Sequence, residues 1–389
     1  MFEFDPYAWE FHEDPYPVYR RLRDEAPDYR DERLGFWALS RHDDVLAGFR
    51  DTDHLSNAQG VSLEKSSHPD ASQTASFLAM DPPRHDRMRA LVARGFTPKR
   101  ISDLEPRIRE ITRMHMDRFQ GDRRCDFVQQ FAGLVPMDVI SEMLGVPAED
   151  RDRLRHLADT VLHREDGVAG IPAESADAAR SLMGYFHGLV ADRRARPRAD
   201  LPSALLEAEV DGEKLADREV MSFLFLMVIA GNETTTKLLG NALYWLWRNP
   251  DARRAVTADR GLVAAWAEET LRYDPSTQIL ARTAKGDFEL GGRRIRDGEK
   301  VLLLVGSANR DERVFPDPDR YDLGRDTSAS LAFGKGTHFC MGASLARLEA
   351  RVALEEVLDR MPDFEIDPAG LVRVHSVNVR GFASMPVRF

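Results

Sequence analysis

The segment that most constrains the fold runs from Asp217 to Arg248, because its first half is apolar around the whole circumference of a helix. The run from Met221 to Ile229 leaves no polar face, so this helix must be buried inside the protein. The polar run AGNETTT follows directly and places Glu233 and Thr234 in the same buried helix. A buried carboxylate and hydroxyl cost free energy unless they have partners or a function. Either the pair has a chemical role, or Asn232 caps a new helix at a break.

Helical periodicity also dominates the chain around this segment. Residues 101 to 248 are predicted to be almost entirely helical, with breaks at glycine and proline. Short β-type runs separated by GG and DG follow Pro275. No internal repeat and no low-complexity linker divides the 389 residues. We therefore expect one domain over residues 1–389, mainly α with small β-sheets.

The composition excludes several classes of protein. A formal net charge of −11 argues against nucleic acid as a partner. The two cysteines, Cys125 and Cys340, lack paired spacing, which argues against a disulfide scaffold or zinc finger and fits a reducing cytoplasm. The N-terminus lacks the pattern of a signal peptide, and no apolar run is long enough to span a bilayer. We expect a cytoplasmic monomer without a membrane anchor.

The loop FGKGTHFCMG delivers Cys340 to the start of a predicted helix. Free N–H groups at a helix start favour an anion, which lowers the pKa of a thiol and keeps the sulfur as thiolate. The glycines of the loop, Gly334 and Gly342 among them, permit a sharp turn or close approach to a flat object. A structural cysteine beside an ordinary turn is the alternative.

Two further pairs have helical spacing. His85 and Arg89 lie four residues apart after DPP, on a helix that we predict to begin there. Glu269 and Arg272 lie three apart and can pair on one helical turn. By themselves these pairs are typical of a solvated basic face and of an exposed ion pair.

Four motifs, in this order along nearly the whole chain, resemble those of the cytochrome P450 family and in particular its soluble bacterial members: AGNETT, ETLR, FPDPDRYDLGR and FGKGTHFCMG. The resemblance implies the cytochrome P450 fold, a triangular prism of about a dozen helices around a buried haem b. It also implies a haem-thiolate monooxygenase.

The resemblance assigns roles residue by residue. Cys340 would be the axial thiolate ligand of the haem iron. The other residues expected at the haem are His85, Arg89, Arg282 and His338 at the propionates, Phe333, Gly334 and Gly342 in the loop, and Ala230 and Gly231 beside the dioxygen site. Thr234 and Glu233 would deliver protons. Glu269, Arg272 and Arg320 would lock the core behind the haem.

The resemblance further implies oxidation of a medium-sized, largely apolar compound, by hydroxylation or epoxidation, as in secondary metabolism. The expected substrate pocket includes Phe225, Ile229, Ile279, Val377 and Asn378, with contributions from the loop at 56–79 and from residues 160–185.

Electrons would come from NAD(P)H through a separate ferredoxin reductase and ferredoxin, because no fused reductase is expected. Arg87, Lys335 and Arg347 would flank the docking face for that partner. The alternatives are a peroxide-using or rearranging haem-thiolate enzyme, a non-catalytic haem sensor, and an α-rich binding protein without haem.

Overall fold

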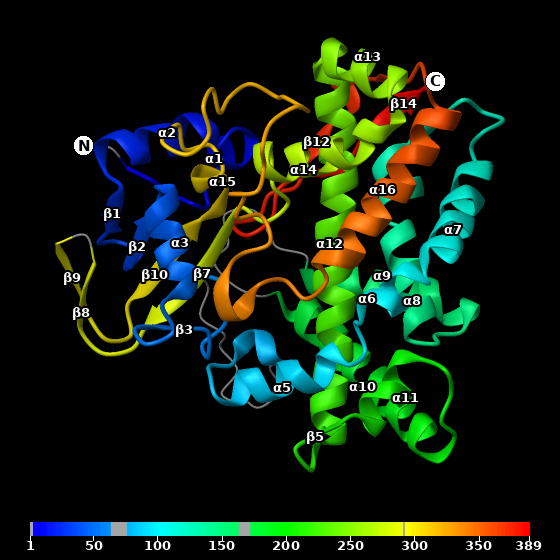
Figure 1. Ribbon diagram of the computed structural model, residues 1–389, viewed down its shortest axis with the longest axis horizontal. Coiled ribbons are helices and arrows are strands. Elements are labelled where there is room, and N and C mark those ends of the chain that lie inside the picture. The colour runs from blue at the N-terminus through cyan, green and yellow to red at the C-terminus, as the bar shows by residue number, and fades with distance from the viewer. Residues whose placement is uncertain (1–2, 64–75, 163–171, 291) are drawn as a thin grey trace.

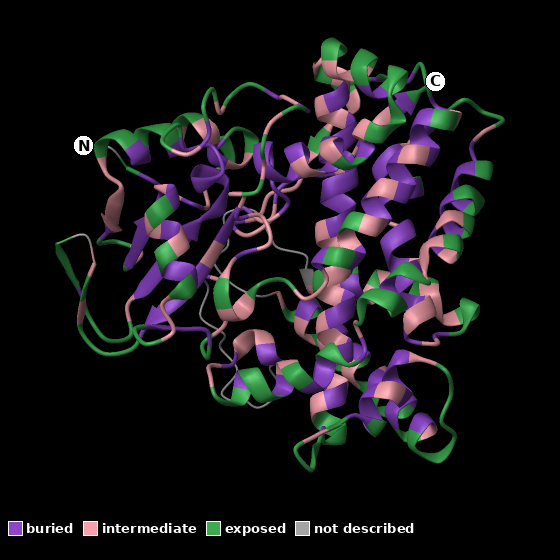
Figure 2. Cartoon of the chain, viewed as in Figure 1, coloured by how far each residue is buried: buried purple, intermediate pink, exposed green. Residues whose placement is uncertain are grey.

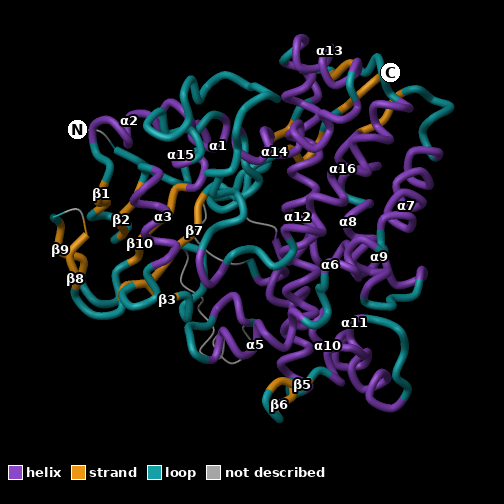
Figure 3. The backbone as a smooth tube through the Cα atoms, viewed as in Figure 1, coloured by secondary structure: helices purple, strands orange, loops and turns teal. Residues whose placement is uncertain are grey.

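The computed structural model describes residues 3–63, 76–162, 172–290 and 292–389. The predicted substrate loop at 56–79 and the region 160–185 therefore lie partly outside the described residues. Most of the long helices gather on one side of the molecule, and the larger sheet lies on the other side with α1, α2, α3 and α15 (Figure 3). The helices are α1 (Trp9–Glu13), α2 (Tyr16–Glu25), α3 (His42–Arg50), α5 (Arg84–Ala93), α6 (Pro98–Ser102), α7 (Glu105–Asp117), α8 (Val135–Met143), α9 (Ala148–Leu162), α10 (Ala173–Ala195), α11 (Leu201–Glu207), α12 (Asp217–Arg248), α13 (Pro250–Ala258), α14 (Val263–Tyr273), α15 (Val305–Ala308) and α16 (Ala343–Arg360).

The strands form one larger sheet and several small ones. They are β1 (Asp28–Asp31), β2 (Phe36–Leu39), β3 (Leu55–Ser56), β4 (Arg124–Asp126), β5 (Glu209–Val210), β6 (Glu213–Lys214), β7 (Ile279–Ala284), β8 (Phe288–Leu290), β9 (Arg293–Ile295), β10 (Lys300–Leu304), β11 (Glu365–Ile366), β12 (Val372–Arg373), β13 (Phe382–Ser384) and β14 (Pro386–Arg388). The larger sheet has the order β1-β2-β10-β7-β3.

Strand β10 is at the centre of the larger sheet and explains the apolar run KVLLL. It pairs parallel with β2 and antiparallel with β7, and all five of its residues are buried. Leu302 and Leu304 pack into one hydrophobic cluster, while Val301 and Leu303 pack into another. Alternate side chains thus fill a core on each face of the sheet. The neighbouring strand β7 carries Arg282 toward the candidate site.

Helix α12 runs through the middle of the molecule (Figure 1) and is buried along much of its length (Figure 2). Its residues from Val220 to Val228 pack in a cluster with apolar side chains of α5, α8, α9, α10 and α11, which we call the upstream cluster. Its residues from Leu238 to Leu246 pack with α14, α16 and the end of the chain in a second cluster, the downstream cluster. The polar run AGNETTT lies where the helix passes from one cluster to the other.

The helix is continuous from Asp217 to Arg248, so the interpretation of Asn232 as the cap of a new helix was wrong. Asn232 is buried in mid-helix, and its Oδ1 has no hydrogen-bond partner among the described residues. Packing of the flanking segments overrides the poor helix propensity of glycine and threonine. None of the described helices combines the length and apolarity needed to cross a bilayer.

Candidate active site

The loop before α16 holds Cys340 in a defined turn. Its backbone N–H donates to Phe333 O at 2.9 Å, and its carbonyl accepts from Ala343 N at 3.4 Å. Gly334 and Gly336 have φ angles of +68° and +70°, in the left-handed region. At Gly336 a Cβ would come 2.9 Å from Phe49 O, so glycine is required for two independent reasons. The loop is thereby packed closely against the end of α3.

The surroundings of Cys340 act on its thiol in opposite directions. Desolvation by the protein raises the pKa of the thiol above its ordinary value, although the residue itself is exposed. The N–H groups of Gly342 and Ala343 and the charges of Arg89 and Arg347 lower the pKa, as predicted for the start of a helix. Because a thiol that binds a metal ion is deprotonated outright, the thiolate form stays a prediction for the iron-bound protein.

Three basic side chains from separate elements lie beside this loop: His85 of α5, Arg282 of β7 and His338 of the loop. Together with Arg89 they are called the cationic cluster. The rings of His85 and His338 lie 4.1 Å apart between centroids. His85 is fully buried, its Nδ1 lies 2.9 Å from Asp86 Oδ1, and its Nε2 has no partner among the described residues. Arg89 donates from Nη2 to Phe339 O at 2.7 Å.

The cationic cluster lacks enough negative charge within the protein. Burial lowers the pKa of Arg282 to about 10, with Asp81 opposing the shift. Burial, followed by the charges of His85 and Arg282, lowers the pKa of His338 to about 3. Burial also lowers the pKa of Arg89. A ligand with carboxylates would restore the charged forms, so the donor set and the unpartnered His85 Nε2 fit the two propionates of haem.

The polar run of α12 presents Thr234 and Ala230 on an accessible part of the helix. Thr234 Oγ1 donates to Ala230 O at 2.8 Å, and Ala230 itself is exposed. Gly231 has a different neighbour, because a Cβ there would come 2.8 Å from Ile140 Cδ1 of α8. Close packing of α8 on α12 thus accounts for Gly231. Its predicted role in leaving space for dioxygen stays a prediction.

Sequence reasoning missed the partner of Glu233. Lys237 Nζ lies 3.0 Å from Glu233 Oε1, and the two side chains are only 6% and 16% exposed, respectively. The spacing of four residues on a helix could have indicated this pair, since side chains at i and i+4 are neighbours.

The predicted core pair is present, but its third member was misassigned. Glu269 and Arg272 are fully buried and form two hydrogen bonds of 2.8 Å. Arg325 Nε, not the side chain of Arg320, lies 3.4 Å from Glu269 Oε1. Arg320 is exposed and lies 3.8 Å from Asp322. Arg320 and Arg325 lie in a loop without periodic structure. In such a loop the spacing of residues in the sequence does not predict which side chain points into the core.

A second buried carboxylate, Asp274, joins distant parts of the chain at the end of α14. It accepts hydrogen bonds from Tyr16 Oη at 2.6 Å, Trp245 Nε1 at 2.9 Å and Arg380 Nε at 2.9 Å. Burial by itself would raise the pKa of Asp274, but the charges of Arg380 and Arg373 and these hydrogen bonds hold it below its usual range. The N-terminal and C-terminal segments are thus fastened to α14 by one ionised group.

The residues predicted to contact a substrate fall into two groups. Phe225 and Ile229 are partly buried beside the upstream cluster on α12. Ile279 and Val377 are buried in the cluster that also covers the N-terminal helices. The amide of Asn378 donates to Ile279 O at 2.9 Å and so joins two backbone segments. Contact of these side chains with a substrate stays a prediction.

Two of the three cations predicted at a partner-docking face are paired within the chain. Arg87 lies 2.7 Å from Glu213, and Arg347 lies 2.5 Å from Glu268. The guanidinium of Arg347 also covers the ring of Phe333 at 4.5 Å. Pairing reduces the positive field that these residues offer to an acidic partner.

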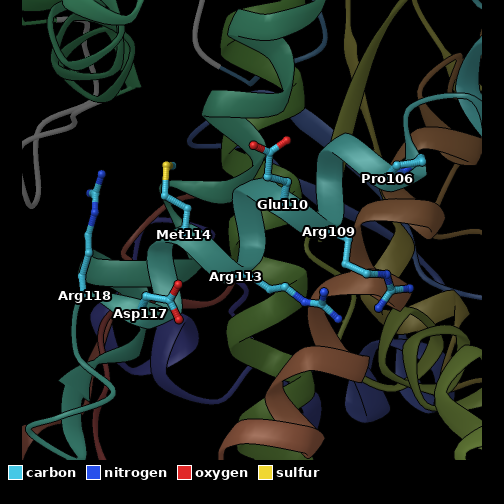
Figure 4. A pocket seen from close by; sticks show the side chains of 7 residues that line it. All are labelled: Pro106, Arg109, Glu110, Arg113, Met114, Asp117 and Arg118. Atoms are coloured by element: carbon cyan, nitrogen blue, oxygen red, sulfur yellow. The ribbon is translucent and has the colours of Figure 1, made fainter.

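A surface depression along α7 lies apart from these groups (Figure 4). Two of its arginines are engaged with α16: Arg109 lies 3.0 Å and Arg113 2.9 Å from Glu356. The depression therefore marks the attachment of α7 to the helix that follows Cys340, and its chemistry is that of an ion-pair network.

Comparison with known proteins agrees with this site. Residues 189–386 match the family model described as Cytochrome P450. A curated relative, a putative cytochrome P450 123 of Mycobacterium tuberculosis, is 58% identical over 385 residues, which cover 98% of this chain and 96% of the relative.

Two solved structures have the same fold over nearly their whole length. The polyketide synthase cytochrome P450 PksS of Bacillus subtilis superposes with a TM-score of 0.91 at 34% identity, covering 99% of each chain. CYP109E1 of Bacillus megaterium, solved in complex with testosterone, superposes with a TM-score of 0.86 at 33% identity, covering 96% of this chain and 99% of that one.

Proposed function

The chain belongs to the cytochrome P450 family and is a haem-binding monooxygenase, and from this premise we propose that it inserts one oxygen atom from O2 into a medium-sized, largely apolar compound. Hydroxylation or epoxidation of a polyketide, terpenoid or steroid-like molecule is the expected reaction. Support comes from the polyketide context in the name of PksS and from the testosterone bound to CYP109E1. The apolar side chains of Phe225 and Ile229 on α12 suit such a substrate.

The residues of the chain divide the work of holding the cofactor. Cys340 would bind the iron through Sγ, with the N–H groups of Gly342 and Ala343 directed at the sulfur. The cationic cluster would hold the propionates through charge-assisted hydrogen bonds. When bound, haem supplies the reductive activation of dioxygen, and a thiolate ligand favours cleavage of the O–O bond.

Thr234 and Glu233 would move the protons that this reaction consumes. The hydroxyl hydrogen of Thr234 is directed at Ala230 O in the structure, so it must turn from that carbonyl before Oγ1 can donate elsewhere. Glu233 would then restore the proton on Oγ1. Such a relay provides protons without admitting bulk water to the site.

The observation that carries this proposal is the cationic cluster beside Cys340, in which four basic side chains converge and the buried His85 Nε2 has no partner among the described residues. The test is the absorption spectrum of the reduced protein with carbon monoxide. We expect the red-shifted Soret band of thiolate ligation, its loss in Cys340→Ser, and its retention in Cys125→Ser, because Cys125 is buried in the downstream cluster. Persistence of the shifted band in Cys340→Ser would refute the assignment.

We propose separate electron carriers, a ferredoxin and its NAD(P)H-dependent reductase, for a monomeric haem domain spanning residues 1–389 in the cytoplasm. The acid and alcohol on α12 favour this route over direct use of peroxide, because peroxide already contains the protons that a relay provides. Product formation should require NAD(P)H with both carriers. Equal product yield from hydrogen peroxide alone would favour the peroxide-using alternative.

A further inference from the structure

We propose that Lys237 is a positioning residue that holds the carboxylate of Glu233 in a fixed direction, and that this arrangement is anchored on the C-terminal β-hairpin. The inference rests on the proton-relay role proposed above for Glu233. It adds a residue that touches neither haem nor substrate, and it connects oxygen activation on α12 to strand β13.

The ion pair differs from the many surface pairs of this protein by its burial. Lys237 Nζ and Glu233 Oε1 are 3.0 Å apart, and the lysine side chain is 6% exposed. By contrast, the pair Lys99–Asp103 has the same spacing and a distance of 2.9 Å, but its side chains are 84% and 60% exposed. A buried ammonium is costly unless its partners are well placed. The position of Lys237 therefore depends on its partners inside the protein, not on contact with solvent.

The hairpin of β12 and β13 fixes the lysine from its other side. Lys237 Nζ donates to Phe382 O at 3.2 Å. A Cβ at Gly381 would come 2.7 Å from both Cβ and Cδ of Lys237, so the aliphatic chain of the lysine lies across a position where only glycine fits. The backbone of the hairpin thus determines where the ammonium group is located, and the ammonium group determines where Glu233 is directed.

A second carboxylate, Asp159, also lies in the electrostatic field of Lys237 and Glu233. Asp159 of α9 is near enough for the charge of Glu233 to raise its pKa, in addition to the larger effect of burial, while Lys237, Arg155 and His156 act in the opposite direction. Two carboxylates therefore lie in the field of one buried ammonium, although Asp159 itself is exposed. Without Lys237 no ammonium group would offset the repulsion between the two carboxylates or hold Glu233 in its present direction.

The position of Glu233 explains why holding it matters. Adjacent residues on a helix do not face each other, so a Glu233 directed at Lys237 is turned away from Thr234. A proton can pass between them only through an intervening water or after Glu233 leaves the lysine. The ion pair thus sets the resting position of the relay. Without the pair the carboxylate has no fixed position from which to pass a proton, so proton delivery to Thr234 becomes less efficient. Each unproductive cycle then transfers two electrons from NAD(P)H and two protons to O2, releasing H2O2.

The test uses the holoenzyme with its electron carriers. Lys237→Met removes the charge, and Gly381→Ala displaces the lysine without changing any charge. Both variants should raise the H2O2 released per NAD(P)H by roughly threefold or more, since a full proton relay contributes roughly 100-fold. Substrate affinity from the spin-state shift and haem content should stay within about twofold of the wild type. Lys99→Met is the matched control and should match the wild type.

A second readout is independent of turnover. The free energies of unfolding of Lys237→Met, Glu233→Gln and the double variant should be non-additive, because the two side chains interact directly. Additive values would overturn the inference, as would normal coupling of oxygen to product in both Lys237→Met and Gly381→Ala.

Glu233→Gln separates this inference from the proposed function. If Glu233→Gln releases more H2O2 while the Lys237 and Gly381 variants do not, the relay stands and the positioning role of Lys237 is refuted. If Glu233→Gln is as well coupled as the wild type, the relay itself is refuted, and the inference falls with it.

Discussion

The buried pair Glu269–Arg272 gives the most direct test of the physical reasoning, and Glu269→Gln is the perturbation. Glu269 accepts two hydrogen bonds from Arg272 at 2.8 Å and one from Asp322 N at 2.9 Å. Arg272 is fully buried and also donates to the carbonyls of Asn309 and Pro318 at 2.9 and 3.0 Å. The substitution keeps the shape of the side chain but leaves the guanidinium without its counter-charge.

Breaking a buried pair by removing one partner costs about 3–5 kcal/mol. Since domains are stable by only about 5–15 kcal/mol, Glu269→Gln should lose about a fifth or more of the free energy of unfolding. Replacing both residues, as in Glu269→Leu with Arg272→Met, should cost less than the sum of the two single substitutions, because no uncompensated charge remains.

The assay is urea unfolding followed by far-UV circular dichroism and by the fluorescence of buried Trp266. Haem saturation must be matched between samples, because a bound cofactor adds its own stabilisation. The control is Asp103→Asn, which breaks an exposed helical pair and should cost no more than about 1 kcal/mol. A loss for Glu269→Gln as small as that of the control would refute the argument from burial.

Three further predictions concern the cofactor site, the pH dependence and the loop. Arg282→Met should retain several-fold less haem after gel filtration, measured as the Soret to protein absorbance ratio, whereas Arg294→Met, at a side chain 73% exposed, should retain it. Asp274→Asn should be less stable than the wild type at pH 7; because the pKa of Asp274 is depressed by folding, this difference should shrink as the pH falls below about 4, and a constant difference would contradict it. Gly336→Ala should be more destabilising in thermal unfolding than Gly212→Ala, because both glycines have positive φ but only the first is crowded by backbone.

The sequence predicts individual helices and strands better than it predicts which strands pair in a sheet. The apolar circumference of Met221–Ile229 indicates a buried helix, and α12 confirms it. The run KVLLL shows a buried strand, but nothing local to it specifies that β10 pairs with β2 from the start of the chain. Such pairing depends on contacts between residues far apart in sequence, which periodicity does not encode.

The candidate site shows the same limit at the level of single side chains. Cys340 and the cationic cluster could be named from motifs, but the sequence does not show that desolvation by the protein opposes the effect of the helix start on the thiol pKa. Arg325 and Arg320 belong to one aperiodic loop, and only the path of the backbone determines which guanidinium reaches Glu269. The spacing of four residues could have predicted the pairing of Lys237 with Glu233. The burial of Lys237, however, depends on its packing against Gly381, which is far away in the sequence.

Helix α12 passes through two separate hydrophobic clusters, and this arrangement affects which amino-acid substitutions the protein can accept. Apolar substitutions in the upstream cluster alter the surroundings of Phe225 and Ile229, while the helix after Cys340 is supported by the downstream cluster. Separate sites have nearly additive effects on stability. Under the proposed contact of Phe225 and Ile229 with substrate, substitutions in the upstream cluster can therefore change substrate preference while the downstream cluster keeps supporting α16.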